Sequence, residues 1–128
     1  MREKLIKLLE NSYSPYSNFK VAAIVKMKDG KEFNGVNVEN SSYGASICAE
    51  RSAIVSAISN GYKKHDFEEL YVMVSGDNLS TCCFLCRQMI SEMFENNKKI
   101  ILISKNGEEK TFTVDELCPY PFSEEDLK

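Results

Sequence analysis

Segments with the composition of β-strands alternate with segments of helical periodicity along this chain of 128 residues, and their order restricts the fold. Runs rich in β-branched, aromatic and other apolar residues predict strands over 19–27, 31–38, 69–75, 99–105 and 110–114. Apolar residues at helical spacing predict helices over 3–12, 46–61, 82–96 and 114–118. The resulting order, helix–strand–strand–helix–strand–helix–strand–strand–helix, predicts an α/β fold with a mixed sheet of about five strands and helices on both faces.

Turn and cap residues support these boundaries. Asp29-Gly30 predicts a tight hairpin between the first two strands, and Asn60-Gly61 predicts the end of the second helix. Ser46 is the expected N-cap of that helix, and either Ser80 or Thr81 is the expected N-cap of the third.

The charge balance argues against nucleic acid as a partner. The 16 basic and 19 acidic residues give a net charge of −3 without a cluster of Lys or Arg, whereas binding to phosphate backbones needs clustered positive charge. No apolar run is long enough to cross a membrane, and the N-terminus lacks the features of a signal peptide, so a cytoplasmic protein is expected. No linker or repeat divides residues 1–128, which are therefore expected to form one domain acting on a small, uncharged substrate.

Cysteine is the residue type that points most directly to chemistry. The chain has five cysteines, an odd number, and three of them lie in the stretch TCCFLCRQ at 81–88. Disulfide frameworks use even numbers of cysteines in small secreted chains, so metal binding or catalysis is the better interpretation. The single histidine, His65, lies in a polar stretch and is expected in a solvated loop. Any zinc site must therefore use mostly sulfur ligands.

Cys83 and Cys86 open the predicted third helix, where free backbone N–H groups and the helix dipole favour thiolates. A Cys-x-x-Cys pair alone also fits a redox dithiol or half of a structural zinc site. Cys48 lies 35 residues before Cys83, at the start of the other buried helix. Three thiolates from two helix N-termini can hold Zn²⁺ and leave a fourth position for water, which is the pattern of a catalytic zinc site.

Three neighbouring residues fit roles around such a metal. Glu50, in the first turn of the same helix as Cys48, can approach the metal and carry protons between water and substrate. Zn²⁺ with three thiolates carries a net negative charge, which opposes the ionisation of a bound water. Arg51 and Arg87 directly follow site residues and are suited to donate charge-assisted hydrogen bonds to the thiolates, with a surface ion pair as the alternative for either.

Taken together, the motifs NVENSSYG, CAERSA and C-x-x-CRQ resemble the cytidine deaminases of nucleoside salvage, specifically the small homotetrameric kind. The similarity runs from YSPYSNFKVAA near the N-terminus to ELCPYPFSEEDL near the C-terminus. It implies a three-layer α/β/α sandwich around a mixed five-stranded sheet. It also implies zinc-dependent hydrolytic deamination of cytidine and 2′-deoxycytidine, with one Zn²⁺ per subunit of a homotetramer.

The resemblance also assigns roles around the metal. Cys48, Cys83 and Cys86 match the family's zinc thiolates. Glu50 matches the proton shuttle, which takes a proton from zinc-bound water and protonates N3 of cytosine while hydroxide adds to C4. Arg51 matches an arginine that tempers the thiolate charge.

Four further positions match substrate contacts of the family. Phe19 matches an aromatic residue that lies against the base, and the backbone at Ala49 would contact the base edge. Asn37 and Glu39 match the pair that hydrogen-bonds ribose hydroxyls, which implies a nucleoside rather than a free base as substrate.

Other positions concern neighbouring subunits or depart from the family pattern. Tyr43 and Phe122 match residues contributed across subunit interfaces, so that neighbouring chains would complete each site. Cys82 stands where the family usually has proline, and Phe84 and Leu85 stand where it usually has Gly-Ala. The bulk of Phe84 and Leu85 is expected to reshape the pocket or shift substrate preference.

Two alternatives stay open from the residues. A structural zinc module could use Cys82 or Cys118 as a fourth ligand, and would have no use for Glu50. A deaminase of the same fold could act on another aminopyrimidine or on a cytosine-containing antibiotic. Cys82 itself is expected to be a bystander, because the alternative register, which pairs Cys82 with Cys86, would place one sulfur outside the helix start.

Overall fold

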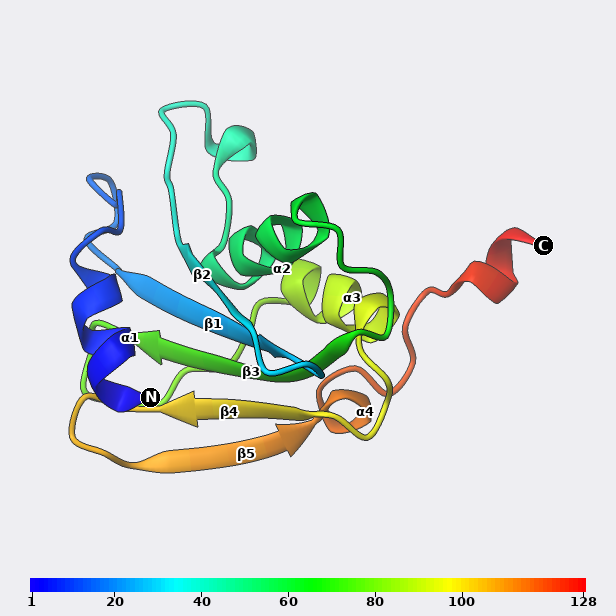
Figure 1. Cartoon of the computed structure of the whole chain (residues 1–128). Helices are drawn as coiled ribbons and strands as arrows, with labels where there is room; N and C mark the ends of the chain where they lie inside the picture. The colour runs from blue at the N-terminus through cyan, green and yellow to red at the C-terminus, as the bar shows by residue number, and fades with distance from the viewer.

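The computed structural model describes residues 1–128 and contains one five-stranded sheet (Figure 1). The strands are β1 (Val21–Met27), β2 (Glu32–Val36), β3 (Phe67–Val74), β4 (Lys99–Ile103) and β5 (Glu109–Thr113). They lie in the order β2-β1-β3-β4-β5, with β3 at the centre. Only β3 and β4 pair in parallel, because they are joined through a helix, and the other pairs are antiparallel. The predicted mixed sheet is confirmed.

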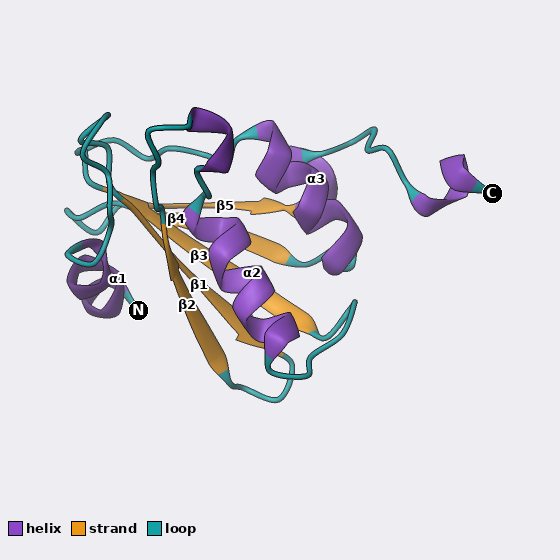
Figure 2. Ribbon diagram, turned by 90° about the horizontal axis from the view of Figure 1, so that it is seen from above, coloured by secondary structure: helices purple, strands orange, loops and turns teal.

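Helices cover both faces of this sheet (Figure 2). They are α1 (Arg2–Leu9), α2 (Ala49–Ser59), α3 (Phe84–Met93) and α4 (Val114–Leu117). Leu5 and Leu9 of α1 pack in one apolar cluster with Ile24 and Ile101 of the sheet. The strand side chains that point to the other face of the sheet pack with residues of α2 and α3 in a second, larger apolar cluster. The expected α/β/α sandwich is therefore confirmed.

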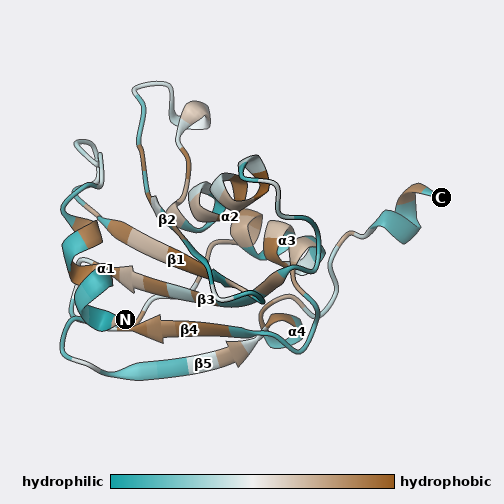
Figure 3. Ribbon diagram, viewed as in Figure 1, coloured by the Kyte–Doolittle hydropathy of each residue, from teal (hydrophilic) through white to brown (hydrophobic).

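The hydropathy of the strands follows their position in the sheet (Figure 3). In β4, the last four residues are buried and apolar, whereas the edge strand β5 begins with exposed polar residues. Polar residues on an edge strand discourage pairing with another chain. None of the helices is long and apolar enough to cross a membrane.

The predicted helix caps are wrong in detail. Helix α2 has Cys48 as its N-cap, and α3 has Cys83, in place of the expected serine or threonine residues. Ser46 instead accepts a hydrogen bond from the backbone N–H of Asn40 at 3.1 Å and so fixes the loop before α2. The predicted stop is correct, because α2 ends at its C-cap Asn60 and is followed by Gly61 with φ of +97°.

Gly35 of β2 lets the first turn of α2 approach the sheet. A Cβ atom at this position would lie 2.3 Å from the carbonyl oxygen of Ala49 and 2.4 Å from the backbone nitrogen of Ala53. Both contacts are to backbone, so a side chain could be accommodated only if the helix moved. The metal-site residues at the start of α2 therefore depend on this glycine.

We expect Gly35→Ala to destabilise the protein by about 1–3 kcal/mol, the usual cost of overpacking. It should also lower zinc content, because Cys48 moves with α2. Urea unfolding and metal analysis would measure both effects. Gly76→Ala is the control, since a Cβ at Gly76 meets nothing within 4 Å. Equal behaviour of the two variants would contradict this explanation.

Candidate metal centre and adjoining cavity

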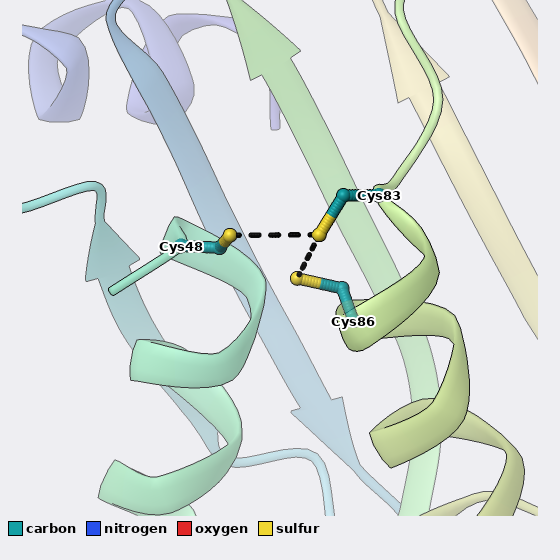
Figure 4. Close-up of side chains that lie close together, drawn as sticks. All are labelled: Cys48, Cys83 and Cys86. Atoms are coloured by element: carbon teal, nitrogen blue, oxygen red, sulfur yellow. Dashed lines mark hydrogen bonds between the residues drawn. The ribbon is translucent and has the colours of Figure 1, made fainter. Parts of the chain in front are cut away.

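Three cysteine sulfurs meet where the N-termini of α2 and α3 lie side by side (Figure 4). The Sγ atoms of Cys48 and Cys83 are 3.6 Å apart, and those of Cys83 and Cys86 are 3.5 Å apart. Sulfurs bound to one tetrahedral zinc at about 2.3 Å lie about 3.8 Å from one another. The three side chains thus fit a zinc ion with little rearrangement, and they are free thiols in a chain that forms no disulfide.

The position of these cysteines at the starts of two helices influences the charge of the group. Cys48 and Cys83 are the N-cap residues of α2 and α3, next to backbone N–H groups that lack partners within the helices. The pKa of Cys48 is lowered to about 5, mainly by hydrogen bonding with Cys86 and further by the Arg51 guanidinium and Cys83. The pKa of Cys86 is raised by its hydrogen bond with the Cys48 sulfur and by burial. A lowered pKa at Cys48 favours its deprotonation, which metal binding requires.

The two arginines expected near the thiolates behave differently. Arg51 places Nη2 3.5 Å from the sulfur of Cys48, so its charge lies against the metal group. Arg87 makes no hydrogen bond with the thiolates. It donates to the backbone carbonyls of Cys82 at 2.8 Å and Leu117 at 3.2 Å. These hydrogen bonds tie α3 to the loop before it and to α4, so any shielding by Arg87 would act without a hydrogen bond to the sulfurs.

Glu50 is a buried carboxylic acid beside the three cysteines. Its residue surface is 5% exposed, in the second position of α2, and it lines the same cavity as Cys48 and Cys83. Burial raises its pKa above the ordinary value. A carboxyl group with a raised pKa holds and releases protons nearer neutral pH, which suits a proton carrier.

A cavity of about 450 Å³ opens from the metal group toward the loops that follow α1 and β2. It has the size of a small-molecule site. Its lining includes most of the residues that the sequence nominated, namely Phe19, Asn37, Glu39, Tyr43, Cys48, Ala49, Glu50, Arg51 and Cys83. Phe122 does not reach it, and lines a separate cavity of about 340 Å³ between the C-terminal segment and α3. Leu85 of the altered loop also lines the first cavity.

Ser17, in the loop before β1, hydrogen-bonds to the cavity residue Glu39, a role that the sequence did not predict. Ser17 donates its hydroxyl proton to the Glu39 carboxylate, which also accepts from the backbone N–H groups of Tyr16 at 3.0 Å and Ser17 at 3.1 Å. These contacts, with the Ser17 side chain foremost, lower the pKa of Glu39. The serine-rich stretch 12–17 directly before Phe19 was the available signal.

No fourth cysteine joins the metal group. Cys82 is buried in the apolar cluster under α2 and α3, and burial raises the pKa of its thiol. Cys118 lies at the end of α4, outside the group formed by Cys48, Cys83 and Cys86. His65 is exposed in a turn with φ of +68°, as expected for a loop residue. The arrangement therefore has three ligands and room for a fourth, exchangeable one.

Replacing Cys82 by Ser should leave one zinc per chain and change the deamination rate by no more than a few-fold. The expected cost in stability is about 1 kcal/mol or less, because the buried hydroxyl keeps the Glu50 carboxyl group as a hydrogen-bond partner. Metal analysis and thermal unfolding of the variant test this. Loss of zinc would show that the register of the cysteine pair is shifted by one residue.

Comparison with known proteins decides the family. A family model described as cytidine and deoxycytidylate deaminase zinc-binding region matches residues 1–110. The chain belongs to this deaminase family. The cytidine deaminase of Halalkalibacterium halodurans is 37% identical over 125 residues, which are 98% of this chain and 93% of that protein. The cytidine deaminase of Sporosarcina psychrophila is 38% identical over 129 residues, with the same coverage of 98% and 93%.

Solved deaminase structures share the fold described above. The crystal structure of cytidine deaminase from Burkholderia pseudomallei matches with a TM-score of 0.89 and 37% identity, covering 94% of each chain. The cytidine deaminase from Mycobacterium leprae matches with a TM-score of 0.78 and 32% identity. These matches confirm the family resemblance and the fold predicted from the sequence. The matched zinc-binding region, together with the geometry of the three sulfurs, identifies zinc as the metal.

Proposed function

We propose that this protein catalyses the hydrolytic deamination of cytidine and 2′-deoxycytidine to uridine and 2′-deoxyuridine, with release of ammonia. The observation that carries this proposal is the meeting of Cys48, Cys83 and Cys86 with the buried Glu50 at one end of a nucleoside-sized cavity. A purely structural zinc site has no use for a carboxyl group buried beside its ligands, because burial disfavours the charged form.

The chain's own residues account for the proton transfers. Zinc held by the three thiolates would lower the pKa of a water molecule and so provide a nucleophile at neutral pH. Glu50 would accept one proton of the attacking water and deliver it to N3 of the cytosine ring, while the water oxygen forms a bond to C4. Glu50 would then carry the second water proton from this oxygen to the amino group, and the bond between C4 and the amino nitrogen would break to release ammonia. Arg51 beside Cys48 offsets part of the thiolate charge that would oppose these steps.

The rest of the cavity fits a nucleoside. Phe19 and Ala49 both line the cavity, which supports the proposal that Phe19 lies against the base and that the backbone at Ala49 contacts its edge. Asn37 and Glu39 at the other end would hydrogen-bond ribose hydroxyls. Glu39 is held as a carboxylate by three donors from the loop, so it can accept a hydrogen bond from a hydroxyl but would repel a phosphate.

A homotetramer of one-domain subunits accounts for the exposed aromatic residues. Tyr43 is 77% exposed at the rim of the cavity and Phe122 is 58% exposed. The C-terminal segment that carries Phe122 projects away from the sheet (Figure 1), which supports a contact of this segment with a neighbouring subunit. The single domain would work in the cytoplasm, in pyrimidine salvage.

A second substrate class has specific support. Blasticidin-S deaminase of Bacillus cereus is 28% identical over 127 residues. Leu85, which stands where the family usually has a small residue, lines the cavity beside Cys83. Comparing turnover of cytidine, 2′-deoxycytidine, free cytosine and blasticidin S separates the candidates. Cytidine and 2′-deoxycytidine should be the preferred substrates, and preference for blasticidin S or free cytosine would refute the nucleoside assignment.

A further inference from the structure

We infer that Ser12 and Ser14 are positioning residues for substrate binding, because they hold and polarise the Asn37 amide, which lines the cavity together with Glu39. Neither serine lines the cavity, and neither belongs to the metal group. They act through Asn37 alone. This inference rests on the proposed function and extends it to specificity.

The orientation of the Asn37 amide is set by two backbone groups. The backbone N–H of Val21 donates to Oδ1 at 2.9 Å, and Nδ2 donates to the carbonyl oxygen of Phe19 at 2.7 Å. A backbone N–H can only donate and a carbonyl can only accept, so the oxygen and nitrogen of the amide cannot be exchanged. One amide hydrogen of Asn37 finds no acceptor in the chain and is available to a ligand.

The two serines extend this contact into a chain of hydrogen bonds. Ser12 Oγ lies 2.5 Å from Asn37 Oδ1, which is an acceptor, so Ser12 must donate its single hydroxyl proton there. Ser12 Oγ also lies 3.1 Å from the Oγ of the buried Ser14 and 3.3 Å from the backbone carbonyl oxygen of Asn37. Because the one proton of Ser12 goes to its shortest contact, Oδ1 of Asn37, Ser14 is the donor in the contact between the two serines. Hydrogen bonds in series polarise one another. Donation into Oδ1 therefore strengthens the free amide hydrogen of Asn37 as a donor.

Asn37 and Glu39 then form a matched donor and acceptor. Both lone-pair sites of Asn37 Oδ1 are used by Ser12 and Val21, so Asn37 offers the cavity only an N–H group. Glu39 is a carboxylate and offers only acceptors. A hydroxyl is the small group that can accept from one and donate to the other at once. Since cytidine and 2′-deoxycytidine are both proposed substrates, the hydroxyl must be the 3′ or 5′ one, which both carry.

Substrate analogues combined with variants test this inference. Wild-type protein should lose about 10- to 100-fold in kcat/KM with whichever of 3′-deoxycytidine and 5′-deoxycytidine lacks the bound hydroxyl, because a carboxylate then loses its partner. In Ser12→Ala, KM for cytidine should rise about 3- to 10-fold with kcat nearly unchanged, and the penalty for the missing hydroxyl should shrink by a similar factor. Ser12→Thr keeps the hydroxyl and should restore both values. Ser14→Ala should give a smaller effect in the same direction.

Ser104→Ala is the matched control. Ser104 is also buried, and its hydroxyl accepts a hydrogen bond from the backbone N–H of Glu108 at 3.0 Å, far along the sequence from this loop. It should lose stability without any change in KM or analogue discrimination. If Ser12→Ala raises KM equally for cytidine and both deoxy analogues, the serine acts only through stability and the inference is wrong. Failure of wild-type protein to deaminate cytidine would instead refute the proposed function.

Discussion

Replacing Glu50 by Gln should lower the turnover of cytidine by about 10³-fold, while the protein keeps its zinc and its fold. Glutamine has the same shape but cannot carry a proton from water to the base. The buried carboxyl group also gains nothing from folding in its charged form, since burial disfavours that form and raises its pKa. The variant should therefore unfold at a temperature equal to or above that of the wild type.

The measurements are the loss of cytidine absorbance, the zinc content and the thermal midpoint on the same preparation. Glu109→Gln is a suitable control, because Glu109 is an exposed carboxylate on the edge strand β5, remote from the cavity. It should behave as wild type. Undiminished turnover in Glu50→Gln would remove the carboxylate from the mechanism and leave the metal group as a structural feature.

Replacing Cys83 by Ala should abolish both zinc binding and deamination. Cys83 is exposed and lies outside the apolar clusters, so its removal takes away a ligand without opening a cavity in the core. Loss of a residue that only hydrogen-bonds to a metal ligand lowers metal affinity by up to roughly 100-fold. Because Cys83 is itself a proposed ligand, we expect its loss to lower zinc affinity by more than that. The thermal midpoint should fall too, because metal binding stabilises the folded state.

Cys118→Ala provides the matched comparison, since it removes a cysteine that is outside the metal group. It should retain one zinc per chain and full turnover. A chelator should convert wild-type protein into a form that resembles Cys83→Ala, and added zinc should restore its turnover. Retention of zinc by Cys83→Ala would mean that another residue completes the ligand set.

The sequence was sufficient for features that depend on local pattern. Strand and helix periodicity predicted the element order, because residues such as Ile24 and Val25 alternate between the two faces of β1. Three thiols near two predicted helix starts were enough to propose the zinc ligands, since thiolates, helix N-termini and zinc favour one another.

The sequence could not predict contacts that depend on how separate segments of the backbone fold together. Arg87 was expected at the thiolates because it follows Cys86, yet the carbonyls of Cys82 and Leu117 take its donors. Cysteines cap α2 and α3 in place of the expected serine or threonine residues, because both helices begin later in the chain than cap preference predicts. Ser12 could not be connected with Asn37, since their contact spans 25 positions and depends on how the loop folds back on the strand.

The most direct test of the account is to measure, on one purified preparation, zinc per chain together with the uridine and ammonia formed from cytidine. The account predicts one zinc per chain and equal amounts of the two products at the expense of cytidine. A protein that holds its zinc in the three-cysteine site but forms neither product from cytidine or 2′-deoxycytidine would contradict it.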